Sequence, residues 1–208
     1  MKRLFDILLA ATGLVLLSPL FALIALWIKC DSRGPVFFRQ VRVGRQGKPF
    51  RIYKFRTMVA DAEKSGYFTA EKDSRVTRSG RFLRKTSLDE LPQLINILTG
   101  EMSVVGPRPT LPYQVEQYTP RQRRRLEVRP GVTGWAQVNG RNTLSWPDRI
   151  EHDIWYVEHW SLLLDLKILA RTVTVWLRGE GLYAEKEKFM VGKDDLKHLE
   201  GEAPDERS

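Results

Sequence analysis

The sequence predicts an α/β fold in a loose sense: a small β-hairpin core surrounded by helices, preceded by a membrane segment. Three observations predict it. Residues 7–28 are 22 consecutive positions without a charge. Two runs of alternating character, at 35–43 and 49–58, flank a short polar link, which is typical of a hairpin. Apolar residues at helical spacing then recur between residues 87 and 178.

The composition limits the classes of protein to consider. A chain of 208 residues has room for one medium domain with a real core. Hydrophobic residues at 42% and charged residues at 28% exclude general disorder. Cys30 is the single cysteine, which excludes an internal disulfide and a cysteine-based zinc site. The three histidines are scattered and have no metal-ligand spacing.

The charge of the chain is unevenly distributed. The net charge is +9, and the last sixteen residues hold three basic and six acidic side chains, so the rest of the chain carries +12. A body that basic favours an anionic partner, which leaves nucleic acid, anionic lipid head groups and phosphorylated substrates.

The N-terminal segment is long enough to cross a bilayer. As a helix, residues 7–28 would measure about 33 Å at about 1.5 Å per residue. A secretory signal fits less well, because its apolar core would be shorter and no small-residue cleavage site follows. Length alone favours a spanning helix.

Two features favour instead a segment that enters one leaflet and turns back. Ser18-Pro19 lies at the midpoint, where proline removes a backbone donor and kinks or breaks a helix. Basic residues flank both ends, and because positive residues stay cytoplasmic, both ends favour the same side. A helix-break-helix satisfies both features, with Ser18 bonded to a carbonyl that the proline frees. Kinked spanning helices are also common, so that alternative stays open.

The predicted hairpin has a basic face. Its second arm alternates, so Lys54 and Arg56 lie side by side on one face. Together they could hold a phosphate. A solvated basic strand face is the alternative.

Asp89 and Glu90 form a carboxylate pair between a basic run and an apolar helical pattern. The basic run contains Arg81, Arg84 and Lys85. Asp89 is predicted in the first turn of a helix, where free N–H groups and the positive end of the dipole favour its ionised form. This suits a nucleophilic or metal-binding carboxylate, and it equally suits an ordinary helix start.

The helix that follows the pair has recognisable ends. Ser87 and Glu90 have the spacing of a capping box, although Pro92 favours a start nearer Leu91. Gly100 gives a stop signal. The i, i+3, i+4, i+7 spacing predicts a buried face made of Leu91, Leu94, Ile95 and Leu98.

Further arginines are candidates for anion binding. Arg108 stands between two prolines after a short apolar strand; a guanidinium on so stiff a loop suits an oxyanion clamp, and a structural turn is the alternative. Residues 121–125 hold four arginines, which suit nucleic acid or, beside a membrane segment, anionic lipid. The loop 129–142 offers Arg141 and Asn142 as candidate substrate contacts.

The last predicted helix, 162–178, is strongly apolar but includes Asp165, Lys167 and Arg171. Such charges argue against a second membrane span. An amphipathic helix that lies at the membrane interface or packs on the core fits better.

These motifs, in this order, resemble those of bacterial sugar transferases of the small monotopic phosphoglycosyl transferase family. The resemblance runs from about Lys2 to Arg178. It rests on Asp6, on Ser18-Pro19, and on residues 53–58, 87–94, 106–109, 129–142 and 164–167.

The resemblance implies a reaction and roles for residues. Enzymes of this family move a sugar-1-phosphate from a UDP-sugar to undecaprenyl phosphate and release UMP. Asp89 would be the nucleophile that forms a covalent phosphosugar intermediate, and Glu90 would be its partner, with Mg²⁺ held at the pair. Asp165 also matches, as a substrate contact or as a structural salt bridge. The residues expected to offset phosphate charge are Lys54, Arg56, Arg84 and Arg108.

The resemblance also implies an organisation. A re-entrant membrane helix at 1–30, broken at Ser18-Pro19, would be followed by a catalytic domain at 31–192 and a mobile acidic tail at 193–208. The protein would act on the cytoplasmic face of the bacterial inner membrane, in the first membrane step of glycoconjugate assembly. Anionic lipids are expected as partners and nucleic acid is not. Three points stay open: which sugar is transferred, which pathway the protein serves, and whether it forms a homodimer. The specificity for the sugar is expected to depend on residues 179–184.

Two rival interpretations remain at this point. The same transfer could proceed by direct attack, with Asp89 only a metal ligand and no covalent intermediate. Alternatively, the chain could be a non-enzymatic basic protein that binds a membrane surface or a polyanion, in which case Asp89→Asn would change no activity.

Overall fold

The computed structural model describes residues 1–62 and 73–178. The predicted acidic tail at 193–208 and the segment 179–184 lie outside the described residues. The helices are α1 (Lys2–Asp31), α2 (Arg78–Lys85), α3 (Gln93–Thr99), α4 (Pro112–Glu116), α5 (Pro120–Arg123), α6 (Trp135–Val138), α7 (Trp146–Glu158) and α8 (Leu162–Arg178). The strands are β1 (Phe37–Val43), β2 (Pro49–Phe55), β3 (Ser103–Val105) and β4 (Gly131–Thr133). Short 3₁₀ turns occur at η1 (Arg45–Gly47), η3 (Leu88–Glu90), η4 (Arg124–Leu126) and η5 (Arg141–Thr143).

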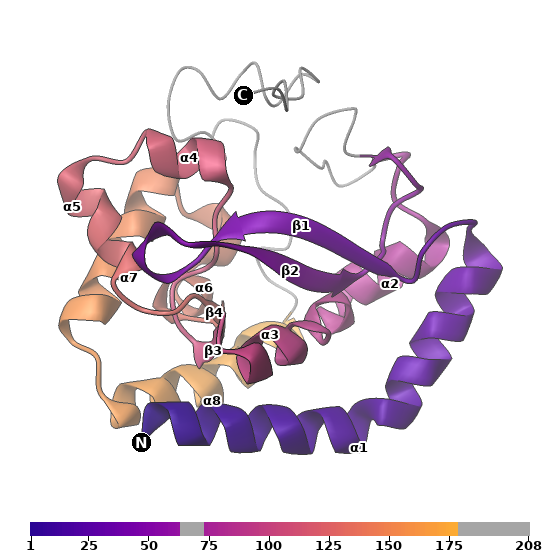
Figure 1. The fold of residues 1–208 in the computed structure, drawn as a ribbon, viewed down its shortest axis with the longest axis horizontal. Helices are drawn as coiled ribbons and strands as arrows, with labels where there is room; N and C mark the ends of the chain where they lie inside the picture. The colour runs from indigo at the N-terminus through magenta and orange to yellow at the C-terminus, as the bar shows by residue number, and fades with distance from the viewer. Residues whose placement is uncertain (63–72, 179–208) are drawn as a thin grey trace.

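The predicted mixed α/β architecture is confirmed. The antiparallel hairpin β1–β2, paired from Phe37 opposite Phe55 to Val43 opposite Pro49, crosses the middle of the molecule with helices around it (Figure 1). A second sheet pairs β3 with β4 in parallel, with Val105 opposite Thr133. Its second strand, β4, falls in a stretch that the sequence indicated only as loop. Three residues carry no periodicity, so this strand depends on its partner β3.

The N-terminal segment is a single bent helix. The α-helical pattern of α1 continues through Pro19, and Figure 1 shows the second half of α1 running at a steep angle to the first. The structure therefore bends the helix where the sequence predicted a break. Ser18 Oγ donates to the Val15 carbonyl at 2.8 Å, the carbonyl that residue 19 would bond if it were not proline. The hydrogen bond predicted for Ser18 is confirmed.

Both halves of α1 pack against the rest of the protein. Ala10 joins a cluster with Ile97, Met102 and residues of β3 and α8, whereas Ile24 and Ile28 join Phe55 and Leu83. The other side of α1 is exposed at large apolar residues. Among the described helices, α1 is long and apolar enough to cross a membrane, by length and composition.

The helix after the carboxylate pair differs from its prediction. The residues of α3 that are fully buried are Gln93, Asn96 and Ile97. Of the predicted face, Leu91 and Leu94 are partly buried against the core and Leu98 is exposed, so the predicted face was wrong in part. The face of α3 that carries Leu94 packs on α1 at Gly13, so closely that a Cβ added to Gly13 would lie 3.2 Å from the Leu94 side chain. Asn96 instead ties α3 to β2, accepting from the Tyr53 N–H at 2.9 Å. An apolar stripe does not reveal which neighbour it will meet.

Candidate active site

Asp89 and Glu90 lie in η3, a short turn between α2 and α3. Ser87 precedes them at φ +54° and makes no side-chain cap, so the predicted capping box was wrong. This left-handed residue redirects the chain after α2. The α-helix begins only after Pro92, whose ring suits a helix start, and the stop at Gly100, with φ +89°, is confirmed.

Glu90 is held by two cations. Lys54 Nζ from β2 and Arg108 Nη2 each lie 2.7 Å from Glu90 Oε1. Burial alone would raise the pKa of Glu90, but the Arg108 and Lys54 charges hold it far below its usual range. Glu90 therefore stays ionised and fixes both cations beside its neighbour.

Asp89 has the opposite environment. Its side chain is buried, and among the residues that the structure describes it has no hydrogen-bond or ion-pair partner. The pKa of Asp89 is raised to about 6, mainly by burial. The negative charge of Glu90 also raises it, whereas the positive charge of Lys54 lowers it. An unshared carboxylate close to cations is suited to attack an electrophile or to bind a metal ion.

The two other residues predicted to bind phosphate, Arg84 and Arg56, form hydrogen bonds with groups outside the carboxylate pair. Arg84 donates from Nε to Thr57 Oγ1 at 2.8 Å, and its charge lowers the pKa of Asp89, so Arg84 is within electrostatic reach of the carboxylate pair. Arg56 donates to the Ser32 and Arg33 carbonyls, at the turn between α1 and β1. The structure thus brings Lys54, Arg84 and Arg108 to the pair and ties Arg56 to the backbone beyond α1.

Glu90 lines a cavity of about 170 Å³, whereas its neighbour Asp89 is not among the lining residues. Ser87 and Glu90 line one part of it and Thr172 and Val175 another. The predicted contacts Arg141 and Asn142 also line it, together with Arg108. Burial, and then the charge of Arg108, lower the pKa of Arg141. The cavity is therefore strongly cationic, as an anionic substrate requires.

Sequence reasoning missed other cavity residues. Arg149 and Gln137 line the cavity, as do Arg125 and Asp153, which form a buried ion pair at 2.5 Å. Arg125 also donates to the Arg108 carbonyl at 3.0 Å and so supports the loop that holds Arg108. The sequence showed Arg125 only as one of a crowded basic run. That run is largely neutralised by α7, with Arg121 on Glu151 and Arg124 on Glu158.

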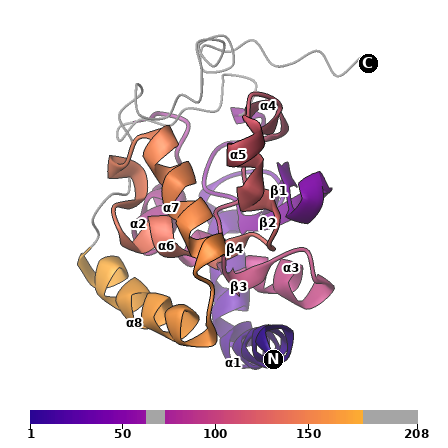
Figure 2. The same cartoon turned by 90° about the vertical axis from the view of Figure 1, so that its left-hand side faces the viewer.

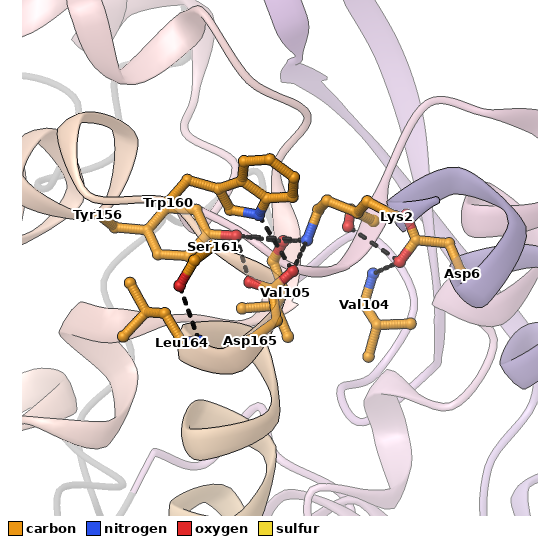
Figure 3. Close-up of polar contacts among 10 residues, drawn as sticks. Lys2, Asp6, Val104, Val105, Tyr156, Trp160, Ser161, Leu164 and Asp165 are labelled. Atoms are coloured by element: carbon orange, nitrogen blue, oxygen red, sulfur yellow. Dashed lines mark hydrogen bonds and ion pairs between the residues drawn. The ribbon is translucent and has the colours of Figure 1, made fainter.

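Asp165 lies in a separate network at the N-terminus of α1. Its carboxylate binds Lys2 Nζ at 2.5 Å, the Tyr156 hydroxyl at 2.7 Å and the Trp160 indole N–H at 3.2 Å (Figure 3). Asp165 does not line the cavity. Of the two roles predicted for it, this placement matches the structural salt bridge. Figure 3 also shows Asp6 of α1 accepting from the Val104 N–H.

The described part of the chain contains no group of three or more His, Cys, Asp or Glu residues arranged to hold a metal ion. Asp89 and Glu90 are the carboxylates at the η3 turn, whereas Asp153, which also lines the cavity, is bonded to Arg125. A Mg²⁺ site commonly uses one or two protein carboxylates completed by substrate phosphates, and the unshared oxygens of Asp89 fit that donor set.

Comparisons with known proteins agree with these features. The family model described as bacterial sugar transferase matches residues 1–179. An uncharacterized sugar transferase of Bacillus subtilis, EpsL, is 49% identical over 187 residues, covering 88% of this chain and 90% of that protein.

Larger relatives match over part of their length. The UDP-glucose:undecaprenyl-phosphate glucose-1-phosphate transferase of Escherichia coli is 48% identical over 184 residues, covering 83% of this chain and 39% of that protein. The undecaprenyl-phosphate galactose phosphotransferase of Salmonella typhimurium is 44% identical over 200 residues, covering 88% of this chain and 42% of that protein. The chain thus spans about two fifths of these relatives and belongs to the bacterial sugar transferase family.

Proposed function

We propose that the protein transfers a sugar-1-phosphate from a UDP-sugar to undecaprenyl phosphate and releases UMP. The names of the Escherichia coli and Salmonella typhimurium relatives support the lipid acceptor and the transferred group. The observation that carries the proposal for this chain is Asp89, a buried and unshared carboxylate whose pKa responds to the charges of Lys54, Arg84 and Arg108. Its neighbour Glu90 lines the cationic cavity.

The geometry supports a covalent route. Asp89 attacks the β-phosphorus of the UDP-sugar, and the bond from that phosphorus to the bridging oxygen breaks, so that its electrons leave with UMP. The sugar-1-phosphate is then bound to Asp89 as an acyl phosphate. Undecaprenyl phosphate attacks the same phosphorus and frees Asp89. Two displacements replace one difficult reaction, and the cations offset charge on the phosphates.

Mg²⁺ would be held by Asp89 and Glu90 together with the substrate phosphates. When bound, it would offset the charge that develops on the transferring phosphoryl group. Glu90, held ionised by Lys54 and Arg108, keeps both cations aligned beside the attacking oxygen.

We further propose that α1 is re-entrant, so that the site lies at the cytoplasmic membrane surface. Lys2 and Arg3, at its start, donate to the Val105 and Ile97 carbonyls of the domain, and its end leads directly into β1. Both ends are thus attached to one body, which favours a single side. The two views place α1 and α8 along the same edge (Figures 1 and 2), and both carry exposed large apolar residues, which suit contact with lipid.

The first test is UMP release from a panel of UDP-sugars with undecaprenyl phosphate and Mg²⁺. We expect release with at least one sugar, and a loss of at least about a thousandfold in Asp89→Asn, because an amide cannot act as the nucleophile. Asp61→Asn is the matched control, since Asp61 is exposed and its positive φ suits asparagine equally. Wild type that is folded but releases no UMP with any sugar would overturn the proposal.

Intact mass separates the covalent route from direct attack. Without lipid acceptor, wild type should gain the mass of one sugar phosphate, and Asp89→Asn should gain none. Lipid-dependent turnover of wild type with no such adduct would favour direct transfer with Asp89 as a metal ligand.

A further inference from the structure

Arg149 is a cation of the cavity that makes no ion pair within the described residues. Arg108 is paired with Glu90, and Arg125 is paired with Asp153. Arg149, from the first turns of α7, lines the same cavity but forms no ion pair with any residue of the described ranges. Its Nη2 atom is buried without a hydrogen-bond partner there. A partly buried guanidinium without a counter-charge is costly to keep unless an anion joins it.

The electrostatic environment of Arg149 agrees with this reading. Burial, followed by the charge of Arg108, lowers its pKa to about 10. Asp153 opposes this effect but is already bonded to Arg125. Since Arg149 stays protonated at neutral pH, its charge is available to a ligand in the cavity.

Arg149 is also fixed in place. Its Nε donates to the Leu144 carbonyl at 3.2 Å, and its guanidinium carbon lies 5.4 Å from the centre of the Trp146 ring. Trp146 lines the cavity as well. These two contacts orient the guanidinium before any ligand arrives, so that little freedom is lost on binding.

The position of Arg149 along the cavity distinguishes it from Arg141. The charges that act on Arg141 include those of Arg108, Glu90 and Asp89. Those that act on Arg149 are Arg108, Asp153 and Arg125, without either member of the carboxylate pair. Arg108 is paired with Glu90, the neighbour of Asp89, and Glu90, Arg108 and Arg149 all line the same cavity. A diphosphate whose β-phosphate meets Asp89 would place its second phosphate in this cavity, within reach of Arg149.

We propose that Arg149 binds the α-phosphate of the UDP-sugar and the phosphate of the UMP product. This inference rests on the proposed transfer reaction and assigns the nucleotide side of its site. When the bond between the β-phosphorus and the bridging oxygen breaks, the electron pair stays on that oxygen and the α-phosphate gains one negative charge. Arg149 stabilises this leaving group, whereas Lys54, Arg84 and Arg108 act at the phosphate that Asp89 attacks.

The test compares UMP with uridine, which lacks the phosphate. Dissociation constants are measured by calorimetry for wild type, Arg149→Gln and Arg149→Lys. We expect Arg149→Gln to weaken UMP binding about tenfold or more, because a charge-assisted hydrogen bond is lost, and to leave uridine affinity unchanged. Arg149→Lys should recover part of the UMP affinity. Arg121→Gln, which removes an exposed cation paired with Glu151 outside the cavity, should bind both ligands like wild type.

Three results would overturn the assignment. UMP affinity that is unchanged in Arg149→Gln excludes the phosphate contact. Equal weakening of UMP and uridine indicates a role for Arg149 at the base or in folding, and so does a failure of Arg149→Lys to recover any affinity. If wild type turns over a UDP-sugar while one of these results is found, only this inference fails. If wild type binds UMP as expected but transfers no sugar phosphate, the proposed reaction fails instead.

Discussion

Asp89 and Glu90 are neighbours in the chain, yet their surroundings shift their pKa values in opposite directions. Glu90 is bonded to Lys54 and Arg108, and these cations hold its pKa far below its usual range. Asp89 is buried without such a bond, and its pKa rises to about 6. Carboxylates that diverge in this way commonly take different roles. Glu90 is a fixed charge in this structure, and the surroundings of Asp89 suit the role of nucleophile that we propose for it.

The raised pKa of Asp89 predicts how the first chemical step depends on pH. A carboxylate with a raised pKa is neutral below that pKa and ionised above it, and only the ionised form attacks phosphorus. We expect the rate of UMP release, measured without lipid acceptor at low UDP-sugar concentration, to fall as the pH drops through about 6. Omitting the acceptor removes the titration of the lipid phosphate from the profile. A rate that stays flat well below that pH would contradict the assignment of Asp89 as nucleophile.

Lys54→Met should move this pH profile. Burial has the largest influence on the pKa of Asp89, and the charge of Lys54 has the second largest. The Lys54 charge lowers this pKa. Its removal should raise the pH midpoint of UMP release, in addition to any loss of rate. Lys48→Met, at the exposed hairpin turn, should leave the midpoint in place. An unmoved midpoint in Lys54→Met would show that Lys54 does not act on the nucleophile.

At the level of elements, α1 is attached to the domain by polar bonds at its start as well as by apolar packing. Asp6 is buried and accepts from Ser103 Oγ at 3.0 Å and from the Val104 N–H at 2.9 Å. Lys2 joins the Val105 carbonyl and Asp165 one turn earlier. These bonds hold the first turns of α1 against β3, so the helix acts as part of the core rather than as a detachable anchor.

Replacing Asp6 should therefore destabilise the whole domain. Asp6→Leu leaves the Ser103 hydroxyl and the Val104 N–H buried without an acceptor, which costs about 1–3 kcal/mol for each unsatisfied group. We expect a lower midpoint of thermal unfolding in detergent. Asp6→Asn keeps one acceptor oxygen and should lose less. Equal midpoints for wild type and Asp6→Leu would mean that the contact does not hold α1 in place.

At the level of the whole molecule, the bend in α1 directs both of its ends to one body. Pro19 allows the bend, Ser18 satisfies the carbonyl that the proline leaves unbonded, and Lys2, Arg3 and the strand after Asp31 attach the two ends. Large apolar side chains are exposed on α1, α2, α3 and α8, and such side chains suit contact with lipid. They include Leu16, Trp27, Phe82, Leu98 and Leu163.

This arrangement predicts the membrane topology. The test uses a Cys30→Ser, Lys48→Cys variant that carries a peptide tag before Met1. Membrane-impermeant reagents should reach both the new thiol and the tag in inverted vesicles, and should reach neither in intact cells. The reason is that Lys2 and Arg3 cannot contact the domain from across a bilayer. A tag reached only from outside intact cells would establish a spanning helix.

Much of the fold and part of the site could be predicted from the sequence, because these features depend on neighbours in the chain. The charge-free segment, the hairpin and the Gly100 stop follow from local patterns. Local chemistry also gave the bond from Ser18 to the carbonyl that Pro19 frees. The motif around Asp89 and Glu90 was recognisable because its residues are consecutive.

Contacts between distant residues were decided only by the tertiary structure. Lys54 and Arg108 meet on Glu90 from positions 36 and 18 residues away, whereas Arg56, two residues beyond Lys54, turns to the backbone after α1. The buried face of α3 and the place of Arg149 in the cavity likewise depend on contacts with residues distant in the chain. Sequence periodicity specifies which side chains share a face of an element, but the burial, charge and pKa of each group depend on the element that packs against that face.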